Sequence, residues 1–251
     1  MLINKKHFNL VFAKGLPMKI RKYGFNLNNY KNQLRRSPLN PKVLASDLHI
    51  DVNKSFKKEF YRKLIHLSSL WIPALIYFVQ PAVSIMIFST IFIGDVLLEY
   101  GNYKKWRWAR RTFGLLFYKT LRNKELKRSQ LQLSGGAYVM LAAIACTLLF
   151  PANIAVVALT VMLISDTCAA LFGKAFGTRR LYKNKSLEGT VAFFLSALAI
   201  MMIYNFILPV TYASILAAFI ATMVEMYEDK IEIDDNLSIP ISVGAVLTLL
   251  G

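Results

Sequence analysis

Long apolar runs alternate with short polar connections over most of the chain. We distinguish seven apolar segments, at residues 64–80, 82–98, 135–150, 152–172, 191–208, 211–226 and 239–251. Most of them approach the ~20 residues that a helix needs to cross about 30 Å of hydrocarbon. Lipid cannot satisfy backbone polar groups, and the runs lack the alternating polarity of barrel strands. The pattern therefore predicts an all-α, polytopic integral membrane protein with about seven transmembrane helices.

The charges lie on one side of these segments. The chain has 251 residues, of which 55% are hydrophobic, and a formal net charge of +17. A soluble domain of this length could not bury so large an apolar fraction. All 31 Lys and Arg residues fall in residues 1–63, 99–134, 173–190 and 227–238, whereas the connections at Pro81, Pro151 and Pro209 are uncharged. Because basic connections remain in the cytoplasm, we expect the uncharged connections on the opposite side.

Two regions follow from this distribution. Residues 1–58 are expected to form a basic N-terminal tail, cytoplasmic and partly disordered, beside anionic lipid. Residues 59–251 are expected to form the membrane-embedded domain. Within it, residues 103–128 mix aromatic side chains with ten cations, which predicts a basic helix in the plane of the membrane interface. Anionic lipid accounts for these cations, so no nucleic-acid partner is expected.

Ionisable residues within apolar segments are informative because each costs roughly 2.5–3.5 kcal/mol on insertion. All of them fall near the ends predicted to be cytoplasmic: His66, Asp95, Glu99, Asp166, Glu225, Asp235 and the neighbouring Asn236. Asp95 and Glu99 are four residues apart and share a helix face. The clustering favours one site at the inner interface over a conduction path, which needs polar groups at several depths. The alternative is that these groups only cap helices and reach water.

Residues 165–190 combine an acid, two glycines, several cations and a second acid. Gly173 and Gly177 form a GxxxG pattern, which serves either close helix packing or close approach of the backbone to phosphate. Arg179, Arg180, Lys183 and Lys185 can neutralise a polyphosphate, and Ser186 can add a hydroxyl. Asp166 and Glu188 can hold a magnesium ion that bridges phosphates. The segment contains no P-loop motif.

These residues resemble the signature region of the lipid kinases that include dolichol kinase, phytol kinase and CTP-dependent diacylglycerol kinase. Their central block is Asp166, Ala169-Ala170, Gly173, Gly177, Lys185-Ser186 and Glu188-Gly189. Flanking stretches are similar too: Arg62 to His66, Gly94-Asp95 with Glu99, Leu133 to Gly136, and Asp235 to Pro240. The likeness covers roughly residues 59–251. The related phosphatidate cytidylyltransferases end in a glycine- and histidine-rich motif that this chain lacks.

The resemblance implies a membrane-embedded enzyme. A nucleoside triphosphate, typically CTP, would donate its γ-phosphate to a polyprenol, a phytol-like alcohol or diacylglycerol, with Mg²⁺ as cofactor. We assign catalytic roles to Asp166, Glu188 and Lys185, with the two carboxylates as metal ligands or one of them as the base. The expected nucleotide- and phosphate-binding residues are Gly173, Gly177, Arg179, Arg180, Lys183 and Ser186. His66, Asp95, Glu99 and Asn236 form a second tier, for which a structural role is equally compatible.

Three functions remain open from sequence: a lipid-alcohol kinase, a cytidylyltransferase that cleaves the nucleotide at a different phosphate, and a non-enzymatic membrane transporter or scaffold. A scaffold would tolerate the change of Asp166 to Asn. The active site is expected to face the cytoplasm, from either a bacterial inner membrane or the endoplasmic reticulum. The accepting alcohol, the nucleotide base and the oligomeric state are not specified by the sequence.

Overall fold

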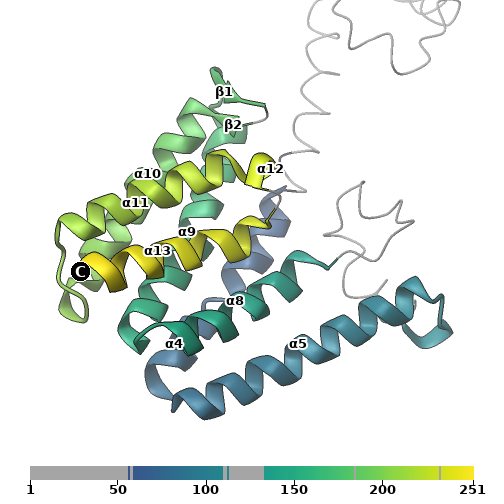
Figure 1. Cartoon of the computed structure of the whole chain (residues 1–251). Helices are drawn as coiled ribbons and strands as arrows, with labels where there is room; N and C mark the ends of the chain where they lie inside the picture. Colours follow the sequence, from purple (N-terminus) through teal and green to yellow (C-terminus); the bar gives the residue numbers. More distant parts are fainter. Residues whose placement is uncertain (1–55, 57–58, 110–111, 113–132, 184, 232) are drawn as a thin grey trace, which may run out of the picture. The chain divides into compact units, whose positions relative to one another are not determined.

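The structure is a computed structural model that describes residues 56, 59–109, 112, 133–183, 185–231 and 233–251. All of them belong to one compact unit, Asn53–Gly251. The expected N-terminal tail, apart from residue 56, and most of the expected interfacial helix at 103–128 lie outside the described residues. Nearly every described segment is helical, as the sequence predicts (Figure 1).

The elements follow one another in a simple order. A helical stretch at residues 59–68 and a turn at 69–70 lead into the first labelled helix. The elements are then α4 (Trp71–Phe78), α5 (Pro81–Tyr103), α8 (Gly135–Leu149), α9 (Ala152–Ala175), β1 (Arg180–Tyr182), β2 (Lys185–Ser186), α10 (Leu187–Ile203), η2 (Tyr204–Phe206), α11 (Tyr212–Met226), α12 (Glu228–Ile231) and α13 (Asp235–Leu250). The first predicted segment, 64–80, is thus divided by the turn.

Prolines and short polar side chains determine where the helices begin. Pro81 is the first residue of α5 and Pro151 caps α9, which confirms the turns predicted there. Ser134 caps α8 by accepting a hydrogen bond from the Ala137 amide, and Ser186 caps α10 through the Gly189 amide. Such caps satisfy amide groups that the first turn of a helix leaves unpaired.

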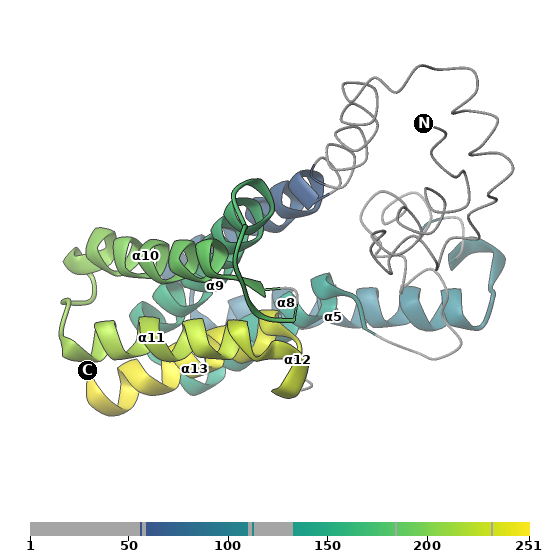
Figure 2. The same ribbon diagram turned by 90° about the horizontal axis from the view of Figure 1, so that it is seen from above.

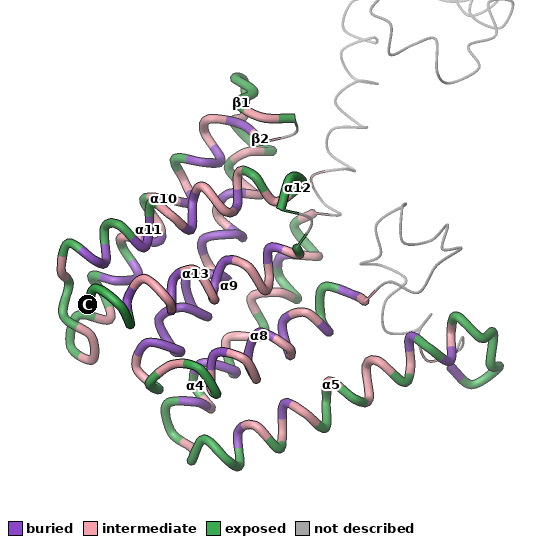
Figure 3. The backbone as a smooth tube through the Cα atoms, in the orientation of Figure 1, coloured by how far each residue is buried: buried purple, intermediate pink, exposed green. Residues whose placement is uncertain are grey.

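Helix α9 is the centre of the fold. It packs against α10, α13, α4 and α8, and Figures 1 and 2 show it enclosed by these helices. Small and branched residues such as Ala155, Val157 and Ala158 are fully buried along it, so neighbouring helices can approach closely from several sides. Helix α5 is the contrast, because little of its length is buried (Figure 3).

Three helical segments are long and apolar enough to cross a membrane: α5, α9 and Leu187–Phe206, which joins α10 to η2. Helices α8, α11 and α13 are apolar but shorter, at 15, 15 and 16 residues. The exposed apolar side chains of α5, such as Met86 and Ile93, suit contact with lipid tails rather than water. A membrane all-α protein is therefore consistent with the structure, whereas the count of seven spans stays a prediction.

Candidate active site

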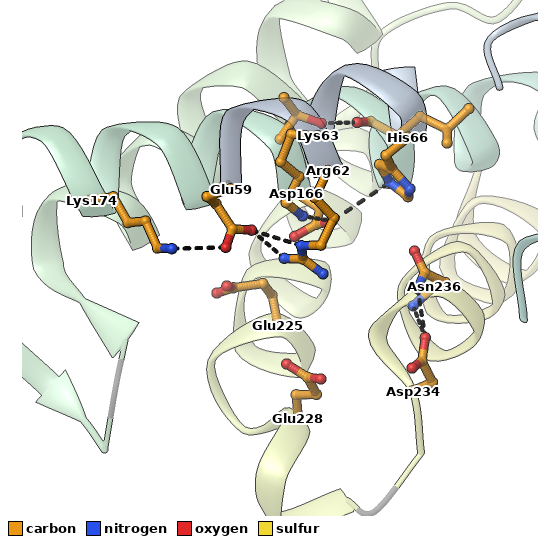
Figure 4. A network of polar contacts seen from close by, with 12 residues as sticks. Glu59, Arg62, Lys63, His66, Asp166, Lys174, Glu225, Glu228, Asp234 and Asn236 are labelled. Carbon is orange, nitrogen blue, oxygen red and sulfur yellow. Dashed lines mark hydrogen bonds and ion pairs between the residues drawn. The ribbon is translucent and has the colours of Figure 1, made fainter. Parts of the chain in front are cut away.

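The helical stretch at residues 59–68 carries one charged face toward the C-terminal half of α9. Glu59, Arg62, Lys63 and His66 are spaced three, four and seven residues from the first, so they share that face. Figure 4 shows them gathered around Asp166. The apolar residues Leu64 and Ile65 between them point outward and are exposed.

Asp166 forms a buried ion pair with Lys63. Its Oδ2 accepts a hydrogen bond from the lysine Nζ, and the exposed fractions of the two side chains are 8% and 4%. The His66 Nε2 atom lies 3.5 Å from the same oxygen. The sequence predicts that an acid inside α9 needs a partner, and the structure identifies that partner as Lys63. In the sequence, Lys63 stands out only as part of the flanking stretch Arg62 to His66. Its position beside the first apolar segment is the signal that could have identified it as the partner of a buried acid.

Glu59 connects this stretch to the end of α9. Its Oε1 accepts hydrogen bonds from Arg62, with the Nε atom at 2.9 Å, and its Oε2 accepts one from Lys174 Nζ at 2.8 Å. Burial alone would raise the pKa of Glu59, but the charges and hydrogen bonds of Arg62 and Lys174 lower it to about 2. Glu59 is therefore ionised throughout the physiological pH range.

Lys185 connects the β-hairpin to α11 and α12. Its Nζ atom lies 2.6 Å from Glu225 Oε1 and 3.2 Å from Glu228 Oε2. Burial would lower the pKa of Lys185, but the charge of Glu225, its hydrogen bond and the charge of Glu228 raise it above the ordinary lysine value. Lys185 is therefore a charged cation held by two carboxylates, and its role in phosphate binding and catalysis stays a prediction.

The remaining predicted cations lie on the same hairpin. Arg179 and Arg180 are exposed, and Lys183 Nζ lies 3.5 Å from Asp229 Oδ2, with both side chains more than half exposed. Lys183 has a positive φ of 44° at the hairpin turn, an uncommon conformation for a residue with a side chain. These three residues can be reached from solvent, and their predicted role in nucleotide binding stays a prediction.

The predicted glycines pack the end of α9 against the start of α10. A Cβ atom at Gly177 would lie 2.8 Å from Ser186 Oγ, and one at Gly189 would lie 2.8 Å from the Ala169 carbonyl oxygen. Gly173 faces the same serine, at 3.0 Å. The structure thus supports the helix-packing interpretation of the GxxxG pattern. Ser186 is buried as the cap of α10, and its predicted contact with phosphate is untested.

Glu188 and Asp166 belong to different hydrogen-bond groups. Glu188 Oε1 accepts hydrogen bonds from the Thr178 amide at 3.0 Å, the Thr178 hydroxyl at 2.5 Å and the Arg179 amide at 3.3 Å. It therefore holds the loop between α9 and β1. Its second carboxylate oxygen is buried and has no hydrogen-bond partner among the described residues.

Three second-tier residues gather at the start of α8. Glu99 Oε1 accepts a hydrogen bond from the Ser134 amide at 2.7 Å. Cβ atoms placed on Gly135 and Gly136 would lie 3.4 Å from Asn236 Nδ2 and 3.8 Å from Asp95 Oδ2. Asp95 and Asn236 thus lie on either side of this helix end. The fourth member of the tier, His66, is at the Lys63–Asp166 pair instead.

Asn236 also holds Asp234, whose Oδ1 accepts hydrogen bonds from the Asn236 side chain at 2.6 Å and its amide at 3.1 Å. Burial and the negative charge of Asp235 raise the pKa of Asp234 to about 7, and the hydrogen bonds from Asn236 oppose this only in part. Asp234 therefore titrates near neutral pH, between two acidic neighbours, Asp235 and Glu228.

Asp235 is a residue that the predicted site omitted. It is 8% exposed in the first turn of α13, and its charge acts on Arg62, His66 and Lys185. It therefore lies near enough to these three residues to influence them electrostatically. Its place beside Asn236 in the closing stretch was a signal in the sequence, but only packing brings α13 to α9.

The carboxylates can be tested as ligands for Mg²⁺. In phosphate-transfer sites this ion is usually held by one or two carboxylates and by substrate phosphates. Within the described ranges, no three His, Cys, Asp or Glu side chains form a group that could hold a metal. Oε2 of Glu188 and Oε2 of Glu225 are buried without a hydrogen-bond partner in the described part of the chain, so they fit as ligands. Asp166 Oδ2 is hydrogen-bonded to Lys63, and His66 Nε2 lies 3.5 Å from it without a hydrogen-bond partner among the described residues.

Comparisons with known proteins place this site in context. No family model and no solved structure matches the chain. A Rickettsia prowazekii protein, "Uncharacterized protein RP860", is 33% identical over 195 residues, which are 75% of this chain and 93% of the relative. A Triticum aestivum protein, "Probable phytol kinase, chloroplastic", is 32% identical over 160 residues, 55% of this chain and 53% of that protein. The chain therefore belongs to the family of the Rickettsia protein and is a distant, partial homologue of the wheat phytol kinase.

Proposed function

We propose that the chain is a lipid-alcohol kinase at the cytoplasmic interface of a membrane. It would transfer the γ-phosphate of a nucleoside triphosphate, with CTP as the donor that the family resemblance implies. The acceptor would be the hydroxyl of a polyprenol, a phytol-like alcohol or diacylglycerol. The observation that carries the proposal is the buried Lys63–Asp166 pair with His66, in a chain partly homologous to a phytol kinase.

The charges of the site suit phosphate transfer. Such catalysis depends mainly on positioning and on stabilising negative charge, because the enzyme needs little covalent chemistry of its own. Arg62, Lys63 and Lys185 provide cations that carboxylates already hold in place, so little reorganisation is needed when phosphates arrive. A buried cation also acts in a medium of low dielectric, where its attraction for phosphate is stronger than in water.

The reaction requires a group that accepts the proton of the alcohol. The oxygen of the alcohol attacks the γ-phosphorus, the bond from that phosphorus to the bridging oxygen breaks, and the nucleoside diphosphate leaves. Asp166, or Glu188 in its place, would accept the proton of the alcohol. Mg²⁺, when bound, would neutralise phosphate charge, and one or two of the carboxylates of Asp166, Glu188 and Glu225 would hold it together with substrate phosphates.

Purified protein in mixed micelles with Mg²⁺ tests this function. Phytol, a polyprenol, diacylglycerol and phosphatidate are each supplied with CTP labelled on either the γ- or the α-phosphate. We expect γ-label in one of the alcohols and none with Asp166→Asn. Lys104→Gln serves as the control, because it removes an exposed charge that lies over the rings of Tyr100 and Tyr103 at the end of α5, and it should retain activity.

Two outcomes would contradict the proposal. Label from the α-phosphate in phosphatidate would identify a cytidylyltransferase. Absence of label with CTP, ATP and UTP would favour a non-enzymatic role. Equal transfer by wild type and Asp166→Asn would leave a kinase but remove Asp166 from its chemistry.

A further inference from the structure

Glu59 holds two cations from different parts of the fold with one carboxylate. Oε1 accepts from Arg62 on the same helical stretch, and Oε2 accepts from Lys174 in the last turn of α9. The Glu59 side chain is 15% exposed, whereas those of Arg62 and Lys174 are 30% and 38% exposed, so the carboxylate is more shielded from water than its two partners. Figure 4 shows Glu59 between Lys174 on one side and Arg62, beside Asp166, on the other.

The contact leaves one edge of Arg62 available. A guanidinium has five N–H donors in a rigid plane, and Glu59 engages the Nε and Nη2 side. In the described part of the chain, the hydrogen bonds of Arg62 use only these two nitrogens. The charges of Asp166 and Asp235 act on Arg62, which places the guanidinium beside the candidate active site. The Nη1 donors are therefore available to a ligand there.

The charge balance matters as much as the geometry. If Glu59 were paired with Arg62 alone, its charge would cancel that of the guanidinium. Because Lys174 shares the carboxylate, Glu59 neutralises the guanidinium only in part. Glu59 can thus fix the orientation of Arg62 without removing its attraction for an anion, and arginine suits the bidentate recognition of phosphate.

We propose that Glu59 is a positioning residue that presents Arg62 to the phosphates of the nucleotide. The proposal rests on the proposed kinase function and adds to it a role for a residue that does not itself touch substrate. An ion pair of purely structural value would stabilise the fold but would leave the affinity of the folded protein for nucleotide unchanged. These two roles make different predictions for binding.

The test is a double-mutant cycle read by nucleotide binding. Wild type, Glu59→Gln, Arg62→Gln and the double variant are purified in detergent micelles. The dissociation constant for CTP is measured without lipid alcohol, and KM and kcat are measured with it. The loss of a charge-assisted contact to phosphate corresponds to roughly a 10- to 100-fold weaker binding. We expect the dissociation constant for CTP to rise by roughly 10- to 100-fold in Arg62→Gln and by about tenfold in Glu59→Gln.

The decisive comparison is within the Arg62→Gln background. If Glu59 acts through Arg62, adding Glu59→Gln there should change the dissociation constant by less than about twofold, because the effects are coupled. We expect KM to rise more than kcat falls, since ground-state binding is weakened. Glu59→Asp, which keeps the charge, should restore part of the affinity, and the control Lys104→Gln should bind CTP as wild type does.

Each other outcome overturns something definite. If Glu59→Gln lowers only thermal stability and leaves the dissociation constant unchanged, or if the two substitutions are additive, the positioning role is wrong while the kinase function stands. If wild type neither binds nucleotide nor transfers phosphate, the proposed function is wrong and this inference falls with it.

Discussion

Removal of either partner of the Lys63–Asp166 pair should destabilise the protein, and by different amounts. A buried ion pair that loses one partner leaves an uncompensated charge in a medium of low dielectric, which costs about 3–5 kcal/mol. The exposed fractions of 4% and 8% justify that range without a discount for solvent. In Lys63→Met, Asp166 retains the nearby positive charge of Arg62, so we expect the lower end of this range.

In Asp166→Leu, Lys63 loses the carboxylate that accepts its one hydrogen bond in the described part of the chain, so we expect the upper end of the range. The double variant Lys63→Met with Asp166→Leu removes both charges and fills the space with apolar atoms. It should be less destabilised than either single variant, within about 2 kcal/mol of wild type, because apolar residues often replace a buried pair without loss.

Equilibrium unfolding in mixed dodecyl maltoside and SDS micelles, followed by far-UV circular dichroism, measures these differences. The exposed Lys183–Asp229 pair is a matched control, since such pairs contribute about 0–1 kcal/mol. Additive costs for Lys63 and Asp166, or single variants as stable as wild type, would refute the reasoning. Either result would mean that water or another group compensates these charges.

Three further predictions concern packing, pH and topology. Gly189→Ala should lower the unfolding free energy by about 1–3 kcal/mol, because the added Cβ would lie too close to the Ala169 carbonyl oxygen. Gly94→Ala has open space around its Cβ and should be near neutral. Equal unfolding curves for the two variants would contradict this reasoning. The raised pKa of Asp234 contributes stability at low pH that is lost as pH rises from the ordinary value of 3.8 through about 7, so the thermal stability of Asp234→Asn relative to wild type should increase over that range. A difference independent of pH would be evidence against the raised pKa. A tag after Pro151 should be labelled only from outside the cytoplasm and one at Lys183 only from inside, and labelling of both from one side would rule out the expected orientation.

Local sequence was sufficient for the helices because the signals that define them are local. Helices α5 (Pro81–Tyr103), α8 (Gly135–Leu149), α9 (Ala152–Ala175) and α11 (Tyr212–Met226) each coincide with a predicted apolar segment to within a few residues. A continuous apolar run favours a helix, and a proline at its start fixes where the helix begins; both effects depend on residues within one or two helical turns. The break at residues 69–70 was not predicted, since the apolar pattern continues through it.

Only part of the candidate site could be predicted from the sequence. Asp166 lies in the C-terminal half of α9, Lys185 on β2 and Glu188 in the first turn of α10, and their partners could not be read from neighbouring residues. Lys63 and Asp166 are 103 positions apart, Glu59 and Lys174 are 115 apart, and Lys185 and Glu225 are 40 apart. Asp235 was likewise passed over, although it lies next to a residue that was chosen.

The sequence by itself determined that apolar helices form, roughly where they begin, and that their charged residues lie at ends predicted to share one side. The tertiary structure decided which charges meet. The physical reason is that a buried charge requires compensation, and several cations in this chain could provide it. Which of them does so depends on how the stretch at 59–68, α9, α11 and α13 pack together, and that arrangement depends on contacts distributed over the whole domain.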